Sequence, residues 1–393
     1  MVVLTQEKDG VKGFLPGSWW VFVATGLWRP RSWQSPFLVY LYKGFSIFTI
    51  FLVYTFTTTS ILGIIANHGG IAAVMSDFLL LSFIACCGKS INMIVCRDTI
   101  IDVIDTLQRD PCMPRDAVEE DIQYKREHFV WINTLIYGIL TEVTAMMVSV
   151  GSLLQHPEEG ELPFNTWLPY YHDSGFGYRF AYGQQIISIW FSASMAVAYD
   201  TAVPGMMMEI CAKLDVLKYR FLNFRTLLET SENVSAFVNE RRLVTECVRC
   251  HLIILRLAET INDVFNAVVF LQYSLSTLLI CVSIYNLANT NIMSSEGSGI
   301  ILYLGCMLME IFILCAAGNE LTLVSESIAD AIYEMDWTEL NGSTIQSLIL
   351  IMTRTTHPIV FKCGSIVDMS LESFKSLVKL SYSTFNLLQQ TSA

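Results

Sequence analysis

The residues that could do chemistry in this sequence are charged side chains set within long apolar runs. Four acids stand singly in such runs, at Asp77, Glu142, Asp200 and Glu310. Ionisable side chains inside a membrane are rare and commonly functional, so each of the four is a candidate buried acid. An enzyme would need acids and histidines clustered at a cavity, and these are scattered. We therefore predict no enzyme and no catalytic residue.

A second motif with chemical potential is CVRCH, Cys247 to His251, which matches the C-x-x-C-H pattern of covalent haem attachment. Haem is attached outside the cytoplasm, whereas this segment is expected to face inward, as argued below. The remaining histidines are scattered along the chain. We interpret the two cysteines as thiols on a charged cytoplasmic helix, and we expect no cofactor and no metal.

The composition indicates which elements position these residues. Of 393 residues, 53% are hydrophobic and 15% are charged, whereas soluble domains carry about 25% charged residues. The net charge of −12 offers no basic face to phosphates, which argues against nucleic acid as a partner. A run of about 20 apolar residues crosses a bilayer. The sequence predicts an all-α polytopic membrane protein with seven transmembrane helices, at Gly44–Ala66, Gly70–Cys96, Phe129–Leu154, Phe180–Met208, Val264–Ala288, Gly299–Asn319 and Ile366–Leu388.

Basic residues predict the orientation, because Lys and Arg stay cytoplasmic in short loops. Most of the 24 basic residues lie in the N-terminal segment and in the segments after spans two, four and six. The opposite loops, at about 67–69, 155–178 and 289–298, contain none. We predict a cytoplasmic N-terminus and an extracellular C-terminus, the reverse of a G-protein-coupled receptor. The sequons at Asn233 and Asn341 then face inward, and we expect neither to be glycosylated.

Apolar residues between spans four and five recur at helical spacing on both sides of a polar break. We predict two cytoplasmic helices that continue these spans, and their apolar stripes must pack on something. Together with the short run Ile345–Met352 they are expected to form an intracellular packing domain. The alternative is a linker, which lacks such periodicity. The residues of the two stripes are Leu214, Leu217, Phe221, Phe224, Leu227 and Leu228, then Leu243, Val244, Cys247, His251, Ile254 and Leu257.

The predicted spans divide the chain into six regions. These are a cytoplasmic N-terminal segment (1–36), transmembrane helices one to four (37–208), cytoplasmic helical extensions forming an anchor (209–263), transmembrane helices five and six (264–319), a cytoplasmic anchor segment (320–365), and transmembrane helix seven with a short extracellular tail (366–393).

The seventh span is the most polar, and its polar residues share one face. At 100° per residue, seven polar side chains fall within about 40° of a single line. Charge in lipid is costly, so this stripe must face other helices or an aqueous path, and both readings remain open. One helix encloses no pore, so a conducting path would need several chains around an axis. The stripe consists of Asp368, Glu372, Lys375, Lys379, Tyr382, Asn386 and Gln390.

Several segments resemble the insect odorant receptors. SYSTFNLLQ (Ser381–Gln389) is similar to the terminal-helix signature of that family. The preceding text resembles it as well, in ELTLVSESIADAIYEMDW (Glu320–Trp337) and in the residues from Ile351 to Phe385. LPFNTWLPY (Leu162–Tyr170) resembles its second outer loop. The resemblance covers roughly 320–390 and that loop, and elsewhere it rests on layout.

The resemblance implies a ligand-gated, non-selective cation channel in the plasma membrane of olfactory sensory neuron dendrites or cilia. Four subunits would surround a pore lined by the seventh helix and held by an intracellular anchor. Most members are odorant-tuned subunits that need a co-receptor, which carries a large insertion between spans four and five. Segment 209–263 lacks such an insertion, so we expect an odorant-tuned subunit in a heteromer with the co-receptor. The alternative is a seven-helix G-protein-coupled or gustatory-type chemoreceptor, although the gustatory last-helix signature differs.

For such a receptor the ligand site should be a mostly apolar cavity in the outer half of the bundle. Each candidate lining residue is alternatively a plain packing residue. The ligand candidates are Met75, Phe78, Leu79, Phe83, Met146, Ser149, Val150, Tyr182, Ile186, Ile189, Tyr303 and Met307. In the pore, Phe385 and Leu388 are expected to form an apolar constriction, and amides to face hydrated cations. The amide candidates are Asn386, Gln389 and Gln390.

Overall fold

The structure, a computed structural model, consists almost entirely of helices, which confirms the predicted all-α class. It describes residues 16–66, 79–155, 162–164, 166–168, 175–229, 236–292, 294–337 and 340–392. The elements in chain order are α2 (Pro16–Ala24), α3 (Pro36–Ala66), α5 (Leu79–Val95), α6 (Arg97–Leu107), α7 (Ala117–Gln155), α8 (Gly175–Leu222), α9 (Phe224–Glu229), α10 (Ala236–Asn289), α11 (Ser295–Glu334), α12 (Gly342–Thr355), β1 (Lys362–Cys363), β2 (Val367–Asp368) and α13 (Leu371–Ser392).

Within the described residues, five helices are long and apolar enough to cross a membrane, namely α3, α7, α8, α10 and α11. The pair α5 and α6, bent by 64° at Cys96, makes a sixth candidate. These helices overlap the first six predicted spans, although residues 70–78 of the second span lie outside the described residues. The seventh predicted span coincides with α13, which the same criterion of length and hydropathy does not include. Its lysines, serines and terminal amides together give it a low mean hydropathy, which accounts for that difference.

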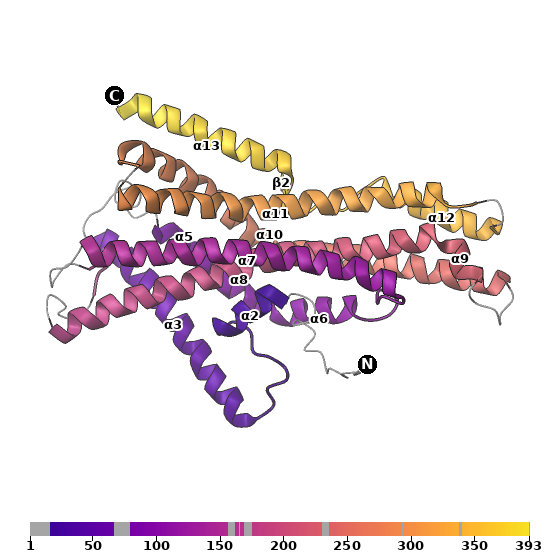
Figure 1. Ribbon diagram of the computed structural model, residues 1–393, viewed down its shortest axis with the longest axis horizontal. Coiled ribbons are helices and arrows are strands. Elements are labelled where there is room, and N and C mark those ends of the chain that lie inside the picture. The colour runs from indigo at the N-terminus through magenta and orange to yellow at the C-terminus, as the bar shows by residue number, and fades with distance from the viewer. Residues whose placement is uncertain are drawn as a thin grey trace.

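The central helices run far beyond the thickness of a bilayer. Helix α10 has 54 residues and α8 has 48. At about 1.5 Å per residue, α10 is roughly 80 Å long, against about 30 Å for a hydrocarbon core. The excess length of these helices packs with α6, α9 and α12 at one end of the molecule (Figure 1). The extensions predicted after span four and before span five are therefore continuous with the spans themselves.

The helical extensions bury the apolar stripes seen in the sequence. Leu217 and Phe221 on α8 are fully buried, as are Cys247 and Ile254 on α10. Polar anchors support this packing. Buried Arg220 on α8 forms a two-pronged ion pair with Glu119, with both N–O distances at 2.7 Å. Fork-shaped pairs of this kind fix orientation as well as adding stability.

The last helix begins later than the sequence indicates. The predicted span starts at Ile366, but β1 and β2 pair antiparallel as a short hairpin around that residue. Gly364 lies in the turn of this hairpin with a φ of +61°, and a Cβ atom at this position would overlap the Phe270 ring. Helix α13 starts only at Leu371, where the Ser370 hydroxyl accepts a bond from the Ser373 amide at 3.2 Å.

This hairpin corrects one part of the predicted polar stripe. Asp368 belongs to β2, so it does not share the helical face of Glu372 and Lys375. The physical cause is backbone hydrogen bonding that hydropathy does not report: the Met369 amide donates to the Phe361 carbonyl at 2.8 Å, which holds the segment before α13 in an extended form.

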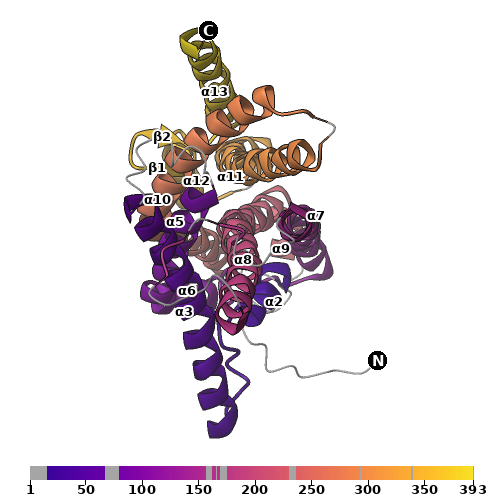
Figure 2. The same ribbon diagram turned by 90° about the vertical axis from the view of Figure 1, so that its left-hand side faces the viewer.

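The helices differ in how deeply they lie in the bundle. Viewed along its length, α8 is surrounded by its neighbours, whereas α3 and α13 project from opposite edges (Figure 2). The burial of α8 agrees with this view, since nearly every residue from Val197 to Leu214 is buried. Helix α13 rests only against one side of the bundle, along α10 and α11.

Candidate functional site

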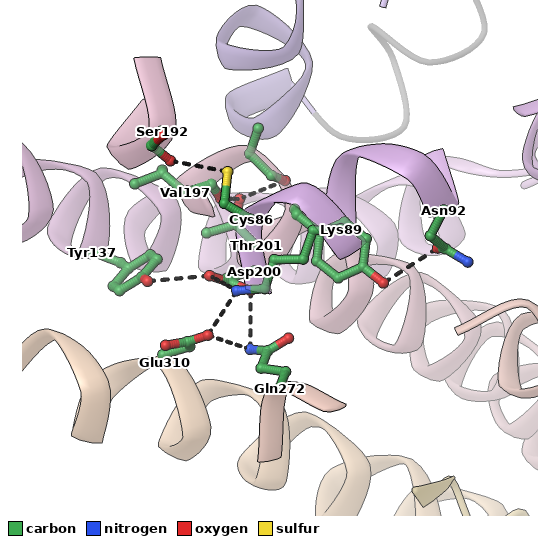
Figure 3. Close-up of polar contacts among 12 residues, drawn as sticks. Cys86, Lys89, Asn92, Tyr137, Ser192, Val197, Asp200, Thr201, Gln272 and Glu310 are labelled. Atoms are coloured by element: carbon green, nitrogen blue, oxygen red, sulfur yellow. Dashed lines mark hydrogen bonds and ion pairs between the residues drawn. The ribbon is translucent and has the colours of Figure 1, made fainter. Parts of the chain in front are cut away.

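A charged cluster lies in the middle of the bundle, which we call the central ion cluster (Lys89, Asp200 and Glu310, with Gln272 and Tyr137). The Lys89 ammonium on α5 lies 2.7 Å from Asp200 Oδ1 on α8 and 2.8 Å from Glu310 Oε1 on α11. All three charged side chains are almost completely buried. The sequence shows these charges as isolated residues in spans two, four and six, and the fold brings them together (Figure 3).

Two further helices complete the cluster with neutral hydrogen-bond donors. The Gln272 amide on α10 donates to Asp200 Oδ1 at 3.0 Å and to Glu310 Oε1 at 2.6 Å. The Tyr137 hydroxyl on α7 donates to Asp200 Oδ2 at 3.3 Å. Five helices are thus joined at one point. A buried charge is tolerated when it is paired and hydrogen-bonded, and removal of one partner of a buried pair leaves the other at a large cost.

A cavity of about 120 Å³ borders this cluster. We call it the central cavity. Its wall is mostly apolar, and α5, α7, α8, α10 and α11 all contribute to it. Lys89, Tyr137 and Glu310 of the central ion cluster form its polar end. A mostly apolar pocket with a few convergent polar groups is the usual form of a small-molecule site.

Five of the predicted ligand residues line this cavity. They are Leu79, Phe83, Ile189, Tyr303 and Met307. They come from α5, α8 and α11, so these predicted residues surround one cavity shared by three helices. That a ligand binds there stays a prediction. Tyr303 also hydrogen-bonds the Ser82 hydroxyl at 2.6 Å across the wall.

The other predicted ligand residues do not line the central cavity. Met146 and Val150 on α7 are 47% and 45% exposed and point to the outside of the bundle. Ser149 is buried and bonds the Ala145 carbonyl, and Tyr182 pairs with Ser152. Ile186 packs beside the cavity against a small cluster that includes Phe83. Met75 and Phe78 lie outside the described residues.

Sequence reasoning missed the residues of α7 and α10 that reach the cavity. Thr141, Thr144 and Val148 face it from α7. Thr144 and Val148 each lie two residues from Met146, and therefore on a different face of the helix. From α10 come Leu275, Ser276 and Leu279, although no ligand residue was expected there. One signal in the sequence could have indicated the location of the site. Lys89, Asp200 and Glu310 lie in separate spans, and buried charges of opposite sign are expected to pair inside the protein.

An aromatic chain leads from the outer loop to the cavity. Phe164 lies 5.9 Å from Phe56 on α3, and Phe56 lies 4.7 Å from Phe83, between ring centroids. Gln185 on α8 holds this loop in place, because its amide bonds both backbone groups of Phe164. Phe164, which belongs to the segment LPFNTWLPY singled out in the sequence, therefore packs on Phe56 next to the cavity residue Phe83.

Helix α10 separates the central cavity from α13. One face of α10 places Gln272, Ser276 and Leu279 at the cluster and cavity. Its other face contacts α13, where the Tyr273 hydroxyl donates to the Ser373 carbonyl at 3.1 Å. Next to it on α11, Glu310 faces the cavity while the Phe312 ring lies 5.5 Å from Phe374 of α13. A displacement of α10 or α11 by a bound molecule would act directly on α13.

The polar stripe of α13 lies on its exposed side. Leu377 and Ser381 are buried toward α10, whereas Glu372, Lys375 and Lys379 are exposed. Phe385 and Asn386, two of the predicted pore residues, are half-buried near the end of the helix. The remaining three, Leu388, Gln389 and Gln390, lie in the last helical turns, where the structure describes only the backbone. Packing among the described residues thus leaves Glu372, Lys375 and Lys379 uncovered.

The CVRCH motif is buried in the helical extensions. Cys247, Cys250 and His251 all point into the packed interior. The Cys250 sulfur lies 3.2 Å from that of Cys112, which follows α6. The motif therefore contributes apolar packing, and among the described residues no group of three potential ligands is arranged to hold a metal ion.

Comparisons with known proteins agree with this geometry. The family described as 7tm Odorant receptor matches residues 70–382 of the chain. Odorant receptor Or1 of Anopheles gambiae is 26% identical over 254 residues, which cover 59% of this chain and 60% of the relative. Putative odorant receptor 85d of Drosophila melanogaster is 25% identical over 232 residues, or 59% and 54%. The chain thus spans little more than half the length of these two relatives.

Similarity extends further along the chain in other comparisons. Odorant receptor 46a, isoform B, of Drosophila melanogaster is 22% identical over 387 residues, which cover 95% of this chain and 97% of the relative. The solved structure of the insect olfactory receptor OR5 from Machilis hrabei, in complex with eugenol, superposes with a TM-score of 0.81 at 16% identity. It covers 98% of this chain and 100% of that one, so the two share a fold.

Proposed function

Because this chain belongs to the 7tm odorant receptor family, we propose that it is a subunit of an odorant-gated, non-selective cation channel. The observation that carries the proposal is the position of α10, which has the central cavity on one face and the polar helix α13 on the other. A ligand site and a polar transmembrane helix are thereby one helix apart. This arrangement suits a receptor in which ligand binding moves the pore wall directly.

The ligand in this proposal is a small volatile molecule held in the central cavity. The size and apolar wall of the cavity fit such a molecule, and Phe83, Ile189, Tyr303 and Met307 are its main proposed contacts. Aromatic and methionine side chains adapt to varied apolar shapes. The central ion cluster closes the inner end, so the ligand would reach no deeper than Glu310.

The pore in this proposal is formed by α13 from four subunits. The exposed stripe of Glu372, Lys375 and Lys379 would face water or neighbouring subunits rather than lipid. Phe385 and Leu388 would form the apolar constriction, with the amides of Asn386, Gln389 and Gln390 beside hydrated cations. Several chains are needed because one helix cannot enclose a path, and the number four is what the family resemblance implies.

Gating would follow from differential affinity for two arrangements of α10 and α11. A ligand shifts a conformational equilibrium only if it binds one arrangement more tightly than the other. Filling the cavity separates Ser276 on α10 from Met307 on α11, and both helices carry α13 on their far sides. The open arrangement would therefore be the one with the outer end of α13 displaced from the axis.

We further propose that the chain works in the plasma membrane of olfactory neurons beside a co-receptor subunit. The short connection between α8 and α10, about residues 223–235, supports an odorant-tuned subunit rather than a co-receptor. The N-terminus would be cytoplasmic and the C-terminus extracellular, as the basic residues indicate. The anchor formed by the extensions of α8, α10 and α11 with α12 would then lie inside the cell.

The decisive experiment records membrane current in cells that express this chain with and without an insect odorant co-receptor, against a broad odorant panel. We expect a cation current that follows odorant addition within the co-expressing cells, and silence in cells with this chain alone. A response that depends on G proteins, or no response in either case from chains present at the surface, would contradict the proposal.

A further inference from the structure

We propose that the central cavity selects small ligands that carry a hydrogen-bond-donating head, a hydroxyl or a protonated amine, and that Glu310 receives this head. The inference rests on the proposed function, since it names the ligand class of the same cavity. It follows from three observations: the unpaired oxygen of Glu310, the charge balance of the central ion cluster, and the lack of another unengaged charged acceptor among the described residues of the wall.

The first observation concerns the two oxygens of Glu310. Both donors that reach this carboxylate, Lys89 and Gln272, bond the same oxygen, Oε1, at 2.8 and 2.6 Å. Figure 3 shows both dashed lines ending on that oxygen, while the other points away from the cluster. Among the described residues no donor bonds Oε2. The side chain is only 4% exposed and lines the cavity, so its open oxygen faces the space that a ligand would fill.

The second observation concerns charge. The cluster combines two carboxylates, Asp200 and Glu310, with a single ammonium, Lys89, so its formal charge is −1. Asp200 is fully engaged, because Lys89, Gln272 and Tyr137 all donate to it. Glu310 is therefore the carboxylate whose negative charge is less well compensated by donors. A buried charge is costly unless it is paired or hydrogen-bonded, so a ligand that brings a donor or a positive charge to Oε2 is favoured.

The third observation is that most other polar groups of the wall already have partners inside the protein, and that an exception, the buried Ser192 hydroxyl, is neutral. The Tyr303 hydroxyl bonds the Ser82 hydroxyl at 2.6 Å. Thr144 Oγ1 donates to the Leu140 carbonyl at 2.8 Å and lies 3.2 Å from the sulfur of Cys306. A ligand's polar head thus meets one strong unengaged acceptor, and it lies at the inner end of the cavity.

Cavity size limits the rest of the ligand. At about 120 Å³, the central cavity is somewhat smaller than an engineered apolar cavity of roughly 150 Å³ that takes benzene. A single ring or a short branched chain with one head group fills it. The apolar body would lie against Phe83, Ile189 and Met307, with the head directed at Glu310.

The test uses the full chain in lipid nanodiscs and four matched one-ring probes: benzylamine, benzyl alcohol, benzaldehyde and toluene. Binding is read as ligand-dependent thermal stabilisation, which yields a dissociation constant for each probe. We expect the amine and the alcohol to bind about tenfold or more tightly than benzaldehyde, because a hydrogen bond to a charged group accounts for that ratio. Benzaldehyde has almost the same size but only accepts hydrogen bonds.

The variant Glu310→Gln should reduce this ratio to less than about threefold and leave toluene binding unchanged, since the charged acceptor is lost and the wall is kept. Glu142→Gln is the matched control: Glu142 is a half-buried acid of α7 that accepts from Ser194 at 2.7 Å, away from the cavity. It should keep the wild-type ratio. If Glu310→Gln does not fold, the dissociation constants of the four probes for the wild-type chain alone test the ligand preference.

Equal or tighter binding of benzaldehyde by the wild-type chain would overturn the inference, because it would mean that Glu310 carries a proton and donates. Currents from the co-expressed channel, recorded with the same probes, separate this failure from that of the proposed function. Donor-selective binding without any current would contradict the channel and leave the ligand preference standing. Currents evoked by all four probes at equal concentrations would support the channel and contradict the preference.

Discussion

Two regions of this chain place charged residues in predicted membrane spans, and they accommodate them in opposite ways. Lys89, Asp200 and Glu310 meet in the middle of the bundle, where each finds a partner within the same chain. Lys375 and Lys379 lie exposed along α13, and no described residue forms an ion pair with either. A charged residue in a predicted span therefore occurs in two settings. It is paired in the interior, or it is exposed on a surface that we propose faces water or another subunit.

The difference has a simple geometric origin. Lys89, Asp200 and Glu310 stand on helices that are each surrounded by neighbours, so long polar side chains can converge. Helix α13 packs mainly against α10 and α11, and among the described residues its opposite face stays exposed. The same residue types thus pair within the chain in one region and lie exposed in the other. The predictions below test this contrast, in order of decreasing effect.

Replacing one lysine in each region should give the largest difference between the two regions, measured as the amount of protein at the cell surface. Lys89→Met leaves two carboxylates buried with one cation missing, and loss of one partner of a buried pair costs about 3–5 kcal/mol. We expect loss of most surface protein, measured by surface biotinylation. The matched variant Lys375→Met removes an exposed charge and should reach the surface at the wild-type level. Normal surface levels of Lys89→Met would show that the central ion cluster does not stabilise the fold.

Two valines on α7 test which face of that helix meets the ligand. Val148 lines the central cavity, whereas Val150 points to the outside of the bundle. Val148→Trp fills the cavity, and overpacking of this kind should raise the odorant concentration for half-maximal current by about tenfold or more. Val150→Trp should change it little. The reverse result would move the ligand site to the face of α7 that carries Val150, one of the ligand residues predicted from the sequence.

The end of α13 tests the other side of the contrast. Asn386→Leu combined with Gln389→Leu removes two amides from the proposed pore wall. Single-channel conductance or cation preference should change on the order of twofold, because pore-lining dipoles replace part of an ion's hydration. Val378→Leu, on a different exposed position of α13, is the control. Permeation that is the same in all three channels would remove these amides from the pore.

The smallest expected effect is on glycosylation, and it tests the orientation of both regions. The sequons at Asn233 and Asn341 should carry no glycan, so glycosidase treatment should leave gel mobility unchanged. Met293→Thr is the positive control, because it creates a sequon at Asn291 in a predicted outer loop. A mobility shift in the wild-type chain, or none in the Met293→Thr variant, would reverse the proposed orientation.

Much of the architecture follows from local patterns in the chain. Apolar runs of bilayer length predict the spans, and the stripe from Leu243 to Leu257 predicts a packed helix that the structure confirms as part of α10. The last span was harder, because the residues around Ile366 are apolar enough to extend a helix. The structure forms a hairpin there instead, in which the backbone of Lys362 in β1 lies opposite that of Asp368 in β2.

The candidate site was only partly predictable. Leu79, Phe83, Ile189, Tyr303 and Met307 reach the central cavity as expected. Met146 and Val150 do not, because α7 is turned so that Thr144 and Val148 face inward. In a membrane, lipid and protein interior are equally apolar, so hydropathy does not distinguish an outward face from an inward one.

By itself, the sequence determined which segments are helical, which of them suit a membrane, and to which family the chain is related, because these depend on residues close together along the chain. Tertiary structure alone decided that three charges from separate spans meet, that a cavity opens beside them, and that α10 stands between this cavity and α13. Those facts depend on the rotation of each helix about its own axis, which is set by contacts between residues distant in the chain.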